Sequence, residues 1–292
     1  MIKLFVSDFD GTLLDEMHSL APETAEAIHA LRASGVSFMP ASGRDYTAIQ
    51  QIMAPIGVKV KCIALNGGEF VDNTGVVQIA YKLPKEKTLE VYNIIKKYDV
   101  ITDWYLENDR VTLVQENVKA VYLDYFMRSS GKTMGEILHL LNDLDLENVM
   151  VSVKDVNRIA EVGAIKIESQ FVDLEERRKC IEELSKVSGI AVTSSYGRNV
   201  EVLSARSTKG NMVESVCELY GIKPEEVVVI GDNYNDMSMI TKFPNSYAMG
   251  NAVLELKDAA KNVADTNYNH GVAKVMYEII ERNKKEAEES AK

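Results

Sequence analysis

The sequence predicts an α/β protein whose core is a parallel β-sheet, with a smaller α+β domain inserted into that core. Three observations support this prediction. Apolar runs typical of buried strands occur near both ends of the chain, at 2–7 and 227–230. Segments with a helical pattern alternate with these runs, as they do in parallel sheets. Between Pro84 and residue 193 this alternation gives way to hairpin-like and helical segments.

Residues 1–80 alternate between strands and helices, which indicates a parallel sheet with helices on both faces. The expected strands of this segment are 2–8, 36–41 and 62–65. A helix between the first two begins at Pro22, because proline is favourable in a first helical turn. It ends at Gly35, because glycine readily adopts the left-handed conformation that terminates helices.

The middle of the chain has a different pattern, and we expect it to form a separate α+β domain over 83–193. It contains a β-hairpin whose turn is Asn108-Asp109. Further strands and helices are expected in it at 149–153, 164–171, 85–97, 118–128 and 174–188. The core domain is then built from two separate segments, 1–82 and 194–292.

After the insertion the first pattern resumes. The remaining expected elements are a helix at 209–220, a buried strand at 227–231, short strands at 247–249 and 263–264, and a closing helix at 272–282. Gly221 is placed to end the first of these helices. The charged tail, 284–292, is expected to fray.

Composition and charge disfavour several classes of function. The net charge of −11 argues against nucleic acid as a partner, because phosphate backbones bind basic surfaces. We expect no membrane span, because no apolar stretch approaches the ~20 residues that a span requires. The first residues run directly into a strand and do not resemble a signal peptide. The three cysteines lack metal-site or disulfide spacing, which favours a reducing, cytoplasmic location.

Four polar segments follow predicted core strands or begin a predicted core helix. They are Asp8-Phe9-Asp10, Ala41-Ser42-Gly43-Arg44, Lys209-Gly210 and Gly231-Asp232-Asn233-Tyr234-Asn235-Asp236. Ligands bind open α/β sheets at the carboxyl ends of their strands. We therefore expect these segments to converge on one site, although they are far apart in the sequence.

The chemistry of these segments indicates a divalent cation and a phosphate. Their carboxylates are Asp8, Asp10, Asp232 and Asp236. Four such groups would repel one another without a cation, and oxygen ligands suit Mg²⁺. One Mg²⁺ and Lys209 would leave the site close to neutral. Ser42 and the backbone N–H groups beside Gly43 could then hydrogen-bond phosphate oxygens where a helix begins.

These motifs resemble those of the haloacid dehalogenase-like (HAD) phosphatases, and among them the Cof-type hydrolases with a large C2B-type cap domain. The motifs D-x-D-G-T-L-L, A-S-G-R, K-G at a helix start and G-D-x-x-N-D-x-x-M occur in this order over the whole chain. The long insertion lies between the second and the third. The resemblance implies a Rossmann-like core and an inserted cap that selects the substrate.

The resemblance also implies a mechanism. Asp8 would attack phosphorus and form an aspartyl phosphate, and Asp10 would act first as general acid and then as general base. The carboxylates of Asp8 and Asp232, with the backbone carbonyl of Asp10, would hold Mg²⁺. Asp236 would orient Lys209 or a metal-bound water.

Four residues would hold the transferring phosphoryl group by the same resemblance: Ser42, Gly43, Lys209 and Asn235. Thr12 would shape the turn after the first strand and could touch the phosphate. Arg44 is open to two interpretations, an ion pair within the protein or a contact with the ligand. His18 is expected to be a surface residue.

The function expected from these features is the hydrolysis of small phosphorylated metabolites, either sugar phosphates or phosphorylated cofactors. Asp10 favours a phosphatase, because dehalogenase members of the family lack this second acid. A phosphosugar mutase uses the same core and remains an alternative. A non-catalytic regulator that binds phosphometabolites is a further one.

Overall fold

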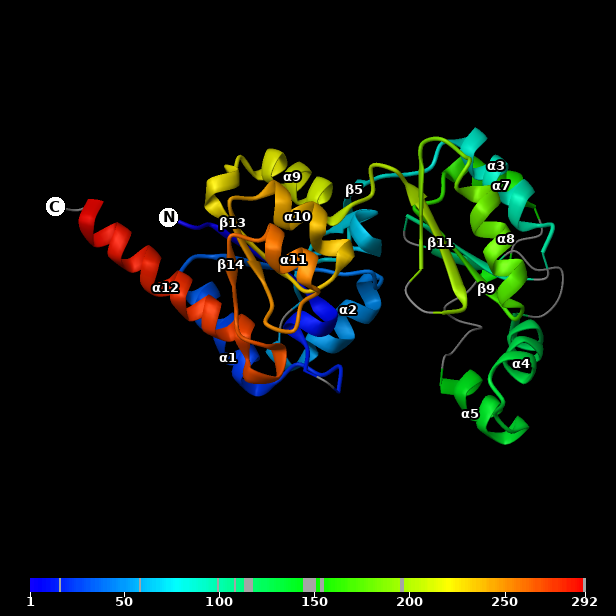
Figure 1. The fold of residues 1–292 in the computed structure, drawn as a ribbon, viewed down its shortest axis with the longest axis horizontal. Coiled ribbons are helices and arrows are strands. Elements are labelled where there is room, and N and C mark those ends of the chain that lie inside the picture. Colours follow the sequence, from blue (N-terminus) through cyan, green and yellow to red (C-terminus); the bar gives the residue numbers. More distant parts are fainter. Residues whose placement is uncertain are drawn as a thin grey trace. The chain divides into compact units, whose positions relative to one another are not determined.

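The computed structural model describes residues 1–15, 17–57, 59–98, 100–107, 109–112, 118–143, 151–152, 155–194 and 197–290. The chain divides into two compact units (Figure 1). The first unit combines Met1–Ile79 with Ser207–Lys292, and the second unit is Ala80–Arg206. The chain thus leaves the first unit once and returns to it.

The first unit contains an eight-stranded sheet in the order β14-β13-β12-β1-β2-β3-β4-β5. The six strands from β14 to β3 are parallel, and β4 runs antiparallel to β3. The strands are β1 (Leu4–Asp8), β2 (Ser37–Ala41), β3 (Cys62–Ala64), β4 (Glu69–Val71), β5 (Val77–Ala80), β12 (Val227–Gly231), β13 (Asn245–Ala248) and β14 (Asn262–Val263). The predicted parallel core is confirmed.

Helices pack against this sheet in two groups. The helices are α1 (Pro22–Ala33), α2 (Tyr46–Met53), α9 (Lys209–Tyr220), α10 (Met237–Lys242), α11 (Leu254–Ala259) and α12 (Gly271–Ser290). Helix α1 packs against α12, whereas α10 packs against both α9 and α11. Right-handed crossovers that run in opposite directions from the centre of a sheet place their helices on opposite faces.

The centre of the sheet is the pair β1 and β12, and its burial explains why these strands were the clearest in the sequence. Val6 and Val229 are register partners and are fully buried. Strands that are covered on both faces read as continuous apolar runs. Asp8 and Gly231 end these two neighbouring parallel strands, so the polar residues that follow begin at the same edge.

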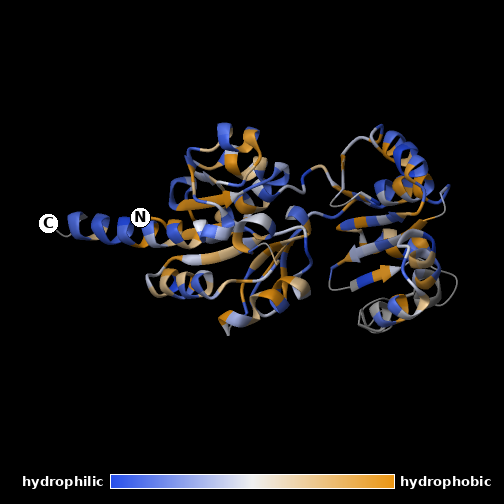
Figure 2. Ribbon diagram, turned by 60° about the horizontal axis from the view of Figure 1, so that its bottom comes forward, coloured by the Kyte–Doolittle hydropathy of each residue, from blue (hydrophilic) through white to orange (hydrophobic). Residues whose placement is uncertain are grey.

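The C-terminal tail differs from its prediction. Helix α12 continues through residues 284–290 instead of fraying there. Glu286 explains part of this difference, because it accepts a hydrogen bond from Arg282 one turn earlier and pairs with the amino group of Met1. Figure 2 shows that this end of the helix is polar.

The second unit contains a six-stranded sheet in the order β10-β11-β9-β6-β7-β8. Neighbouring strands are antiparallel except β7 and β8, which are parallel. The strands are β6 (Val100–Leu106), β7 (Asp109–Thr112), β8 (Val151–Ser152), β9 (Lys166–Phe171), β10 (Ile190–Thr193) and β11 (Asn199–Ser204). The helices are α3 (Lys85–Ile95), α4 (Val118–Ser129), α5 (Met134–Asp143), α7 (Val156–Val162) and α8 (Leu174–Leu184).

The boundary of the inserted unit differs from the predicted 83–193, mainly at its C-terminal side. Strand β11 was assigned to the core segment 194–292, but it pairs with β9 and β10 of the second unit. Residues 194–206 therefore belong to the insertion, as do residues 80–82. The expected hairpin is present as β6 and β7, although Asn108 of its turn lies outside the described residues. A substrate-selecting role for this unit stays a prediction.

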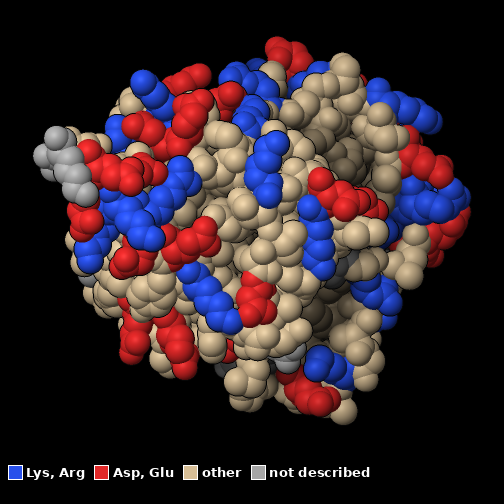
Figure 3. All heavy atoms as spheres, turned by 60° about the vertical axis from the view of Figure 1, so that its left-hand side comes forward, with Lys and Arg blue, Asp and Glu red and all other residues tan. Residues whose placement is uncertain are grey.

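Acidic and basic side chains are intermixed over the face that Figure 3 shows. The net charge of −11 is therefore not displayed there as one continuous acidic field. Among the described residues, no helix combines the length and the apolar character that a bilayer crossing needs.

Candidate active site

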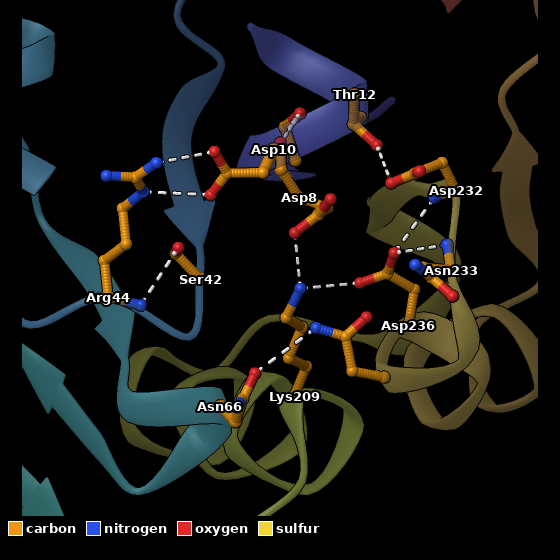
Figure 4. A network of polar contacts seen from close by, with 12 residues as sticks. Asp8, Asp10, Thr12, Ser42, Arg44, Asn66, Lys209, Asp232, Asn233 and Asp236 are labelled. Carbon is orange, nitrogen blue, oxygen red and sulfur yellow. Dashed lines mark hydrogen bonds and ion pairs between the residues drawn. The ribbon is translucent and has the colours of Figure 1, made fainter. Parts of the chain in front are cut away.

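Three carboxylates meet at the carboxyl edge of β1 and β12. They are Asp8, the last residue of β1, Asp232, which directly follows β12, and Asp236, four residues later. One carboxylate oxygen from each lies within 4.8 Å of the others (Figure 4). Asp8 and Asp236 are buried, and Asp232 is partly exposed. The predicted convergence of these distant segments is therefore present in the first unit.

Lys209 lies beside this cluster and is itself fully buried. Its Nζ donates to Asp236 Oδ1 at 2.7 Å and also contacts Asp8 Oδ1. The lysine is the first residue of α9, whose start is fixed by Thr208, because the Thr208 hydroxyl accepts from the backbone N–H of Asn211 at 3.1 Å. Burial alone would lower the pKa of Lys209, but the two carboxylates raise it above its usual value. The amine is therefore held charged.

Asp236 joins the lysine to the loop after β12. Its Oδ2 accepts from the backbone N–H groups of Asp232 at 2.9 Å and of Asn233 at 3.1 Å. Gly231 leaves the space for this carboxylate, since a Cβ there would lie 2.5 Å from its carboxyl carbon. The contact with Lys209 is one of the two arrangements that the family resemblance implied for Asp236, and the role of Asp236 in catalysis remains a prediction.

The cluster carries more negative charge than Lys209 alone can balance. Burial, with a smaller contribution from Asp232, raises the pKa of Asp8 to about 6 against the opposing effect of Lys209. Burial and the charge of Asp8 likewise raise the pKa of Asp236 to about 6. The pKa of Asp232 is raised as well, mainly by burial. A divalent cation would relieve this repulsion, and the carboxylates of Asp8 and Asp232 suit Mg²⁺, which proteins usually bind through one or two carboxylates.

Asp10 points to a different partner. Its carboxylate accepts from Arg44 Nε at 2.9 Å and from Arg44 Nη2 at 2.7 Å (Figure 4). In addition, His18 Nδ1 lies 3.1 Å from Asp10 Oδ1. Partial burial would raise the pKa of Asp10, but these two partners hold it below its usual value. The Asp10 carboxylate is not part of the three-carboxylate cluster. The metal ligand expected from this residue was its backbone carbonyl, which stays a prediction.

The loop after β2 contributes the remaining expected residues. Ser42 is buried, and its hydroxyl accepts from the backbone N–H of Arg44 at 3.2 Å. Asn235 is exposed, and its side-chain amide donates to Asn66 Oδ1 at 3.3 Å. Gly43 lies against the same side chain, because a Cβ there would be 3.1 Å from Asn66 Oδ1. The phosphate contacts expected of Ser42, Gly43 and Asn235 remain predictions.

Sequence reasoning gave some residues of this site no role, or left their role open. Thr12 donates to Asp232 Oδ1 at 3.0 Å and so ties the β1 turn to the β12 loop. Of the two interpretations of Arg44, the ion pair is present. His18 is exposed, as expected, yet it reaches Asp10. Asn66 had no predicted role, and its Asn-Gly sequence, which is typical of a turn, was the one signal available.

The sequence pattern of the haloacid dehalogenase-like hydrolases matches residues 5–276, which is most of the chain and includes every residue of the site described in this subsection. The chain belongs to the haloacid dehalogenase-like hydrolase family. The HAD resemblance drawn from the four motifs is thereby confirmed.

Similar proteins align over nearly their whole length. Phosphatase YwpJ of Bacillus subtilis is 24% identical over 96% of this HAD-like chain and 100% of its own. The 5-amino-6-(5-phospho-D-ribitylamino)uracil phosphatase YwtE of the same organism is 25% identical over 96% of this chain and 98% of its own. Pyridoxal phosphate phosphatase YbhA of Escherichia coli is 23% identical over 94% of this chain and 97% of its own.

Solved structures agree with the fold. A haloacid dehalogenase-like hydrolase from Bacteroides thetaiotaomicron has a TM-score of 0.75 at 24% identity, covering 96% of this HAD-like chain and 100% of its own. A HAD subclass IIB sugar phosphatase has a TM-score of 0.70 at 22% identity, and the alignment covers 95% of this chain and 98% of its own. At this identity the likeness supports the fold alone.

Proposed function

We propose that this protein is a Mg²⁺-dependent phosphatase that hydrolyses small phosphorylated metabolites through an aspartyl phosphate on Asp8. The single observation that carries the proposal is the group formed by the buried residues Lys209, Asp8 and Asp236 together with the partly exposed carboxylate of Asp232. A fixed amine and a set of hard oxygen ligands around one carboxylate suit phosphoryl transfer, where catalysis rests on positioning and charge neutralisation.

In this proposal Asp8 is the nucleophile. Its carboxylate oxygen forms a bond to phosphorus while the bond to the leaving oxygen breaks, and Asp10 gives its proton to that oxygen. Asp10 then takes a proton from the water that attacks the aspartyl phosphate, which releases inorganic phosphate and restores Asp8. Lys209, Ser42, Gly43 and Asn235 hold the phosphoryl oxygens during both steps.

The metal would be held by Asp8, Asp232 and the backbone carbonyl of Asp10, and it would supply positive charge beside the phosphoryl group when bound. Asp236 would keep Lys209 in place. Because Asp236 accepts two backbone N–H groups of the β12 loop, it also fixes the position of Asp232, a proposed ligand. Ligand orientation of this kind commonly tunes metal sites.

The relatives support a proposal for the substrate class. Their names specify a phosphoribitylamino uracil and pyridoxal phosphate, which are both small phosphorylated compounds. We propose the same coarse class for this protein, with sugar phosphates as the leading candidates. We also keep the proposals that it acts in the cytoplasm and that the second unit selects the leaving group.

Turnover of p-nitrophenyl phosphate, with and without Mg²⁺, tests the proposal. We expect turnover only with the metal, and a loss of at least about a thousandfold in Asp8→Asn, which keeps the shape but removes the nucleophile. His139→Asn, in the second unit, serves as the control and should keep the wild-type rate. An Asp8→Asn variant with most of its activity would overturn the assignment of the nucleophile.

Product analysis separates hydrolysis from phosphoryl transfer. With a hexose 1-phosphate as substrate, a phosphatase releases inorganic phosphate, whereas a mutase yields the isomeric hexose phosphate. We expect inorganic phosphate. An absence of both products, together with retained binding of the sugar phosphate, would favour the regulator instead.

A further inference from the structure

The turn after β3 has an unusual backbone. Leu65 and Asn66 are consecutive residues other than glycine, and both have left-handed φ angles, of 51° and 55°. Residues with side chains adopt this region at a cost, which is higher for leucine than for asparagine. Such conformations persist only where the surrounding structure imposes them, and they cluster at functional sites.

The surroundings of this turn are two loops of the active site. Asn66 N–H donates to the carbonyl of Ser42 at 2.8 Å, and Leu65 N–H donates to the carbonyl of Arg44 at 3.0 Å. On its other side, Gly67 packs directly against the backbone between Thr208 and Lys209. The turn is therefore fixed between the loop after β2 and the start of α9.

The Asn66 side chain extends this link to a third loop. Its Oδ1 accepts from the Asn235 amide at 3.3 Å, and the same side chain lies against Gly43. Gly43 and Asn235 were both expected to hold phosphate oxygens. Asn235 is exposed, so a side chain in this position would otherwise sample several rotamers.

We propose that Asn66 is a positioning residue that holds the Asn235 amide in the orientation needed to bind the phosphoryl group. The left-handed backbone at Asn66 places its side chain between Gly43 and Asn235. The inference rests on the proposed function and adds a residue to which the motifs assign no role. Asn66 acts through Asn235 and is not itself required to touch the phosphate.

Two substitutions separate the side chain of Asn66 from its backbone. Asn66→Gly keeps the left-handed backbone accessible and removes the side chain, whereas Asn66→Ala also adds backbone strain. We expect kcat/KM with p-nitrophenyl phosphate to fall about tenfold in Asn66→Gly, the equivalent of one lost hydrogen bond. His270→Gly, another left-handed residue (φ 55°), is the matched control and should leave kcat/KM unchanged.

A double-mutant cycle tests whether Asn66 acts through Asn235. In the background of Asn235→Ala, Asn66→Gly should have less than about a twofold further effect, because its proposed target is gone. Thermal unfolding of each variant shows whether a loss of stability accounts for the loss of activity. An active wild type whose Asn66→Gly variant is unchanged, or whose two substitutions act additively, would overturn the inference.

A second readout does not depend on turnover. The side-chain amide resonances of Asn235, observed in ¹⁵N-labelled protein, should shift in Asn66→Gly and stay in place in His270→Gly. If the wild type hydrolyses no phosphate ester, the proposed function fails, and these resonances still decide whether Asn66 holds Asn235. Unchanged Asn235 resonances in Asn66→Gly would overturn the inference whatever the enzyme does.

Discussion

Gly67→Ala offers a sharp test of how the site is assembled. Gly67 has a φ of +88°, and a Cβ at this position would lie 2.3 Å from the carbonyl carbon and oxygen of Thr208. It would also lie 2.8 Å from the backbone nitrogen of Lys209. All three are backbone atoms, so no flexible side chain can move aside. Either the turn or the start of α9 has to shift.

Gly35 provides the matched control, because it has a φ of +89° and an added Cβ there would meet nothing within 4 Å. Left-handed strain should cost both alanine variants about 1–2 kcal/mol of unfolding free energy. Gly67→Ala should lose about 1–3 kcal/mol more through overpacking. Its kcat should also fall at least about tenfold, because Lys209 would be displaced.

Urea unfolding and p-nitrophenyl phosphate turnover of both variants measure these two effects. We expect Gly35→Ala to keep wild-type turnover despite its lower stability. Equal losses of stability in the two variants, with full activity in Gly67→Ala, would show that the close packing between the turn and Lys209 is not needed. The steric reasoning would then be refuted.

Two further predictions concern ion pairs. Arg44→Met should raise the pKa of Asp10 and lower kcat, because the Asp10 carboxylate loses the two hydrogen bonds that orient it. Arg44→Lys should keep only part of the wild-type rate, because lysine cannot donate two parallel hydrogen bonds; equal rates in both variants would contradict this prediction. Glu168 is buried beside Lys166, at 2.9 Å, and although burial raises its pKa, Lys166 and its hydrogen bonds hold that pKa below the usual value. The stability this pair contributes is therefore present above about pH 4.5 and lost as the pH falls through the lowered pKa. Glu168→Gln should lower the unfolding free energy by about 1–3 kcal/mol at pH 7, because Lys166 loses one of its two buried carboxylate partners and keeps Glu201. It should also flatten the acid dependence, which urea unfolding at pH 7, 5 and 4 measures; an unchanged acid slope would contradict this prediction.

The strands and helices that the sequence predicted best are those whose formation depends on residues within the element or next to it. Helix α9 runs over Lys209–Tyr220 as expected, because Thr208 precedes it and Gly221 ends it in a left-handed conformation. Strand β12 likewise matches 227–231, since its burial on both faces requires a continuous apolar run. Signals of this kind are complete within a few residues of the element that they specify.

Strand β11 shows where local reasoning fails. Val200 and Val202 belong to the hydrophobic core of the second unit, but Asn199 and Glu201, which alternate with them along the strand, are polar and equally buried. Glu201 is accommodated because Lys166, from β9, lies 3.0 Å away. A polar strand face that is satisfied by a partner 35 residues earlier has no signature in its own sequence.

The candidate site likewise contains some features that the sequence predicts and others that it does not. Convergence of Asp8, Asp232 and Lys209 was predictable, because parallel strands put their carboxyl ends at one edge. The orientation of Asp10 was not, because its partner Arg44 is 34 residues away, and either interpretation of that arginine suited the motif. The contact between Asp10 and His18 was not predictable either, because His18 itself has a left-handed backbone conformation (φ 55°) that its sequence does not indicate.

Glycines explain why the motifs have the composition that they do. A Cβ at Gly11 would lie 2.5 Å from Asp232 Oδ2, and one at Gly231 would lie 2.5 Å from the Asp236 carboxyl carbon. Each glycine thus leaves space for an acidic side chain of the β12 loop, and Gly67 does the same for the backbone before Lys209. The sequence indicates turns at these positions, but their shared effect is to let buried charges approach one another. A cluster of carboxylates that are mostly buried destabilises the fold unless a cation compensates their charge. The close approach that these glycines permit therefore lowers stability and, at the same time, forms a site that can bind a cation.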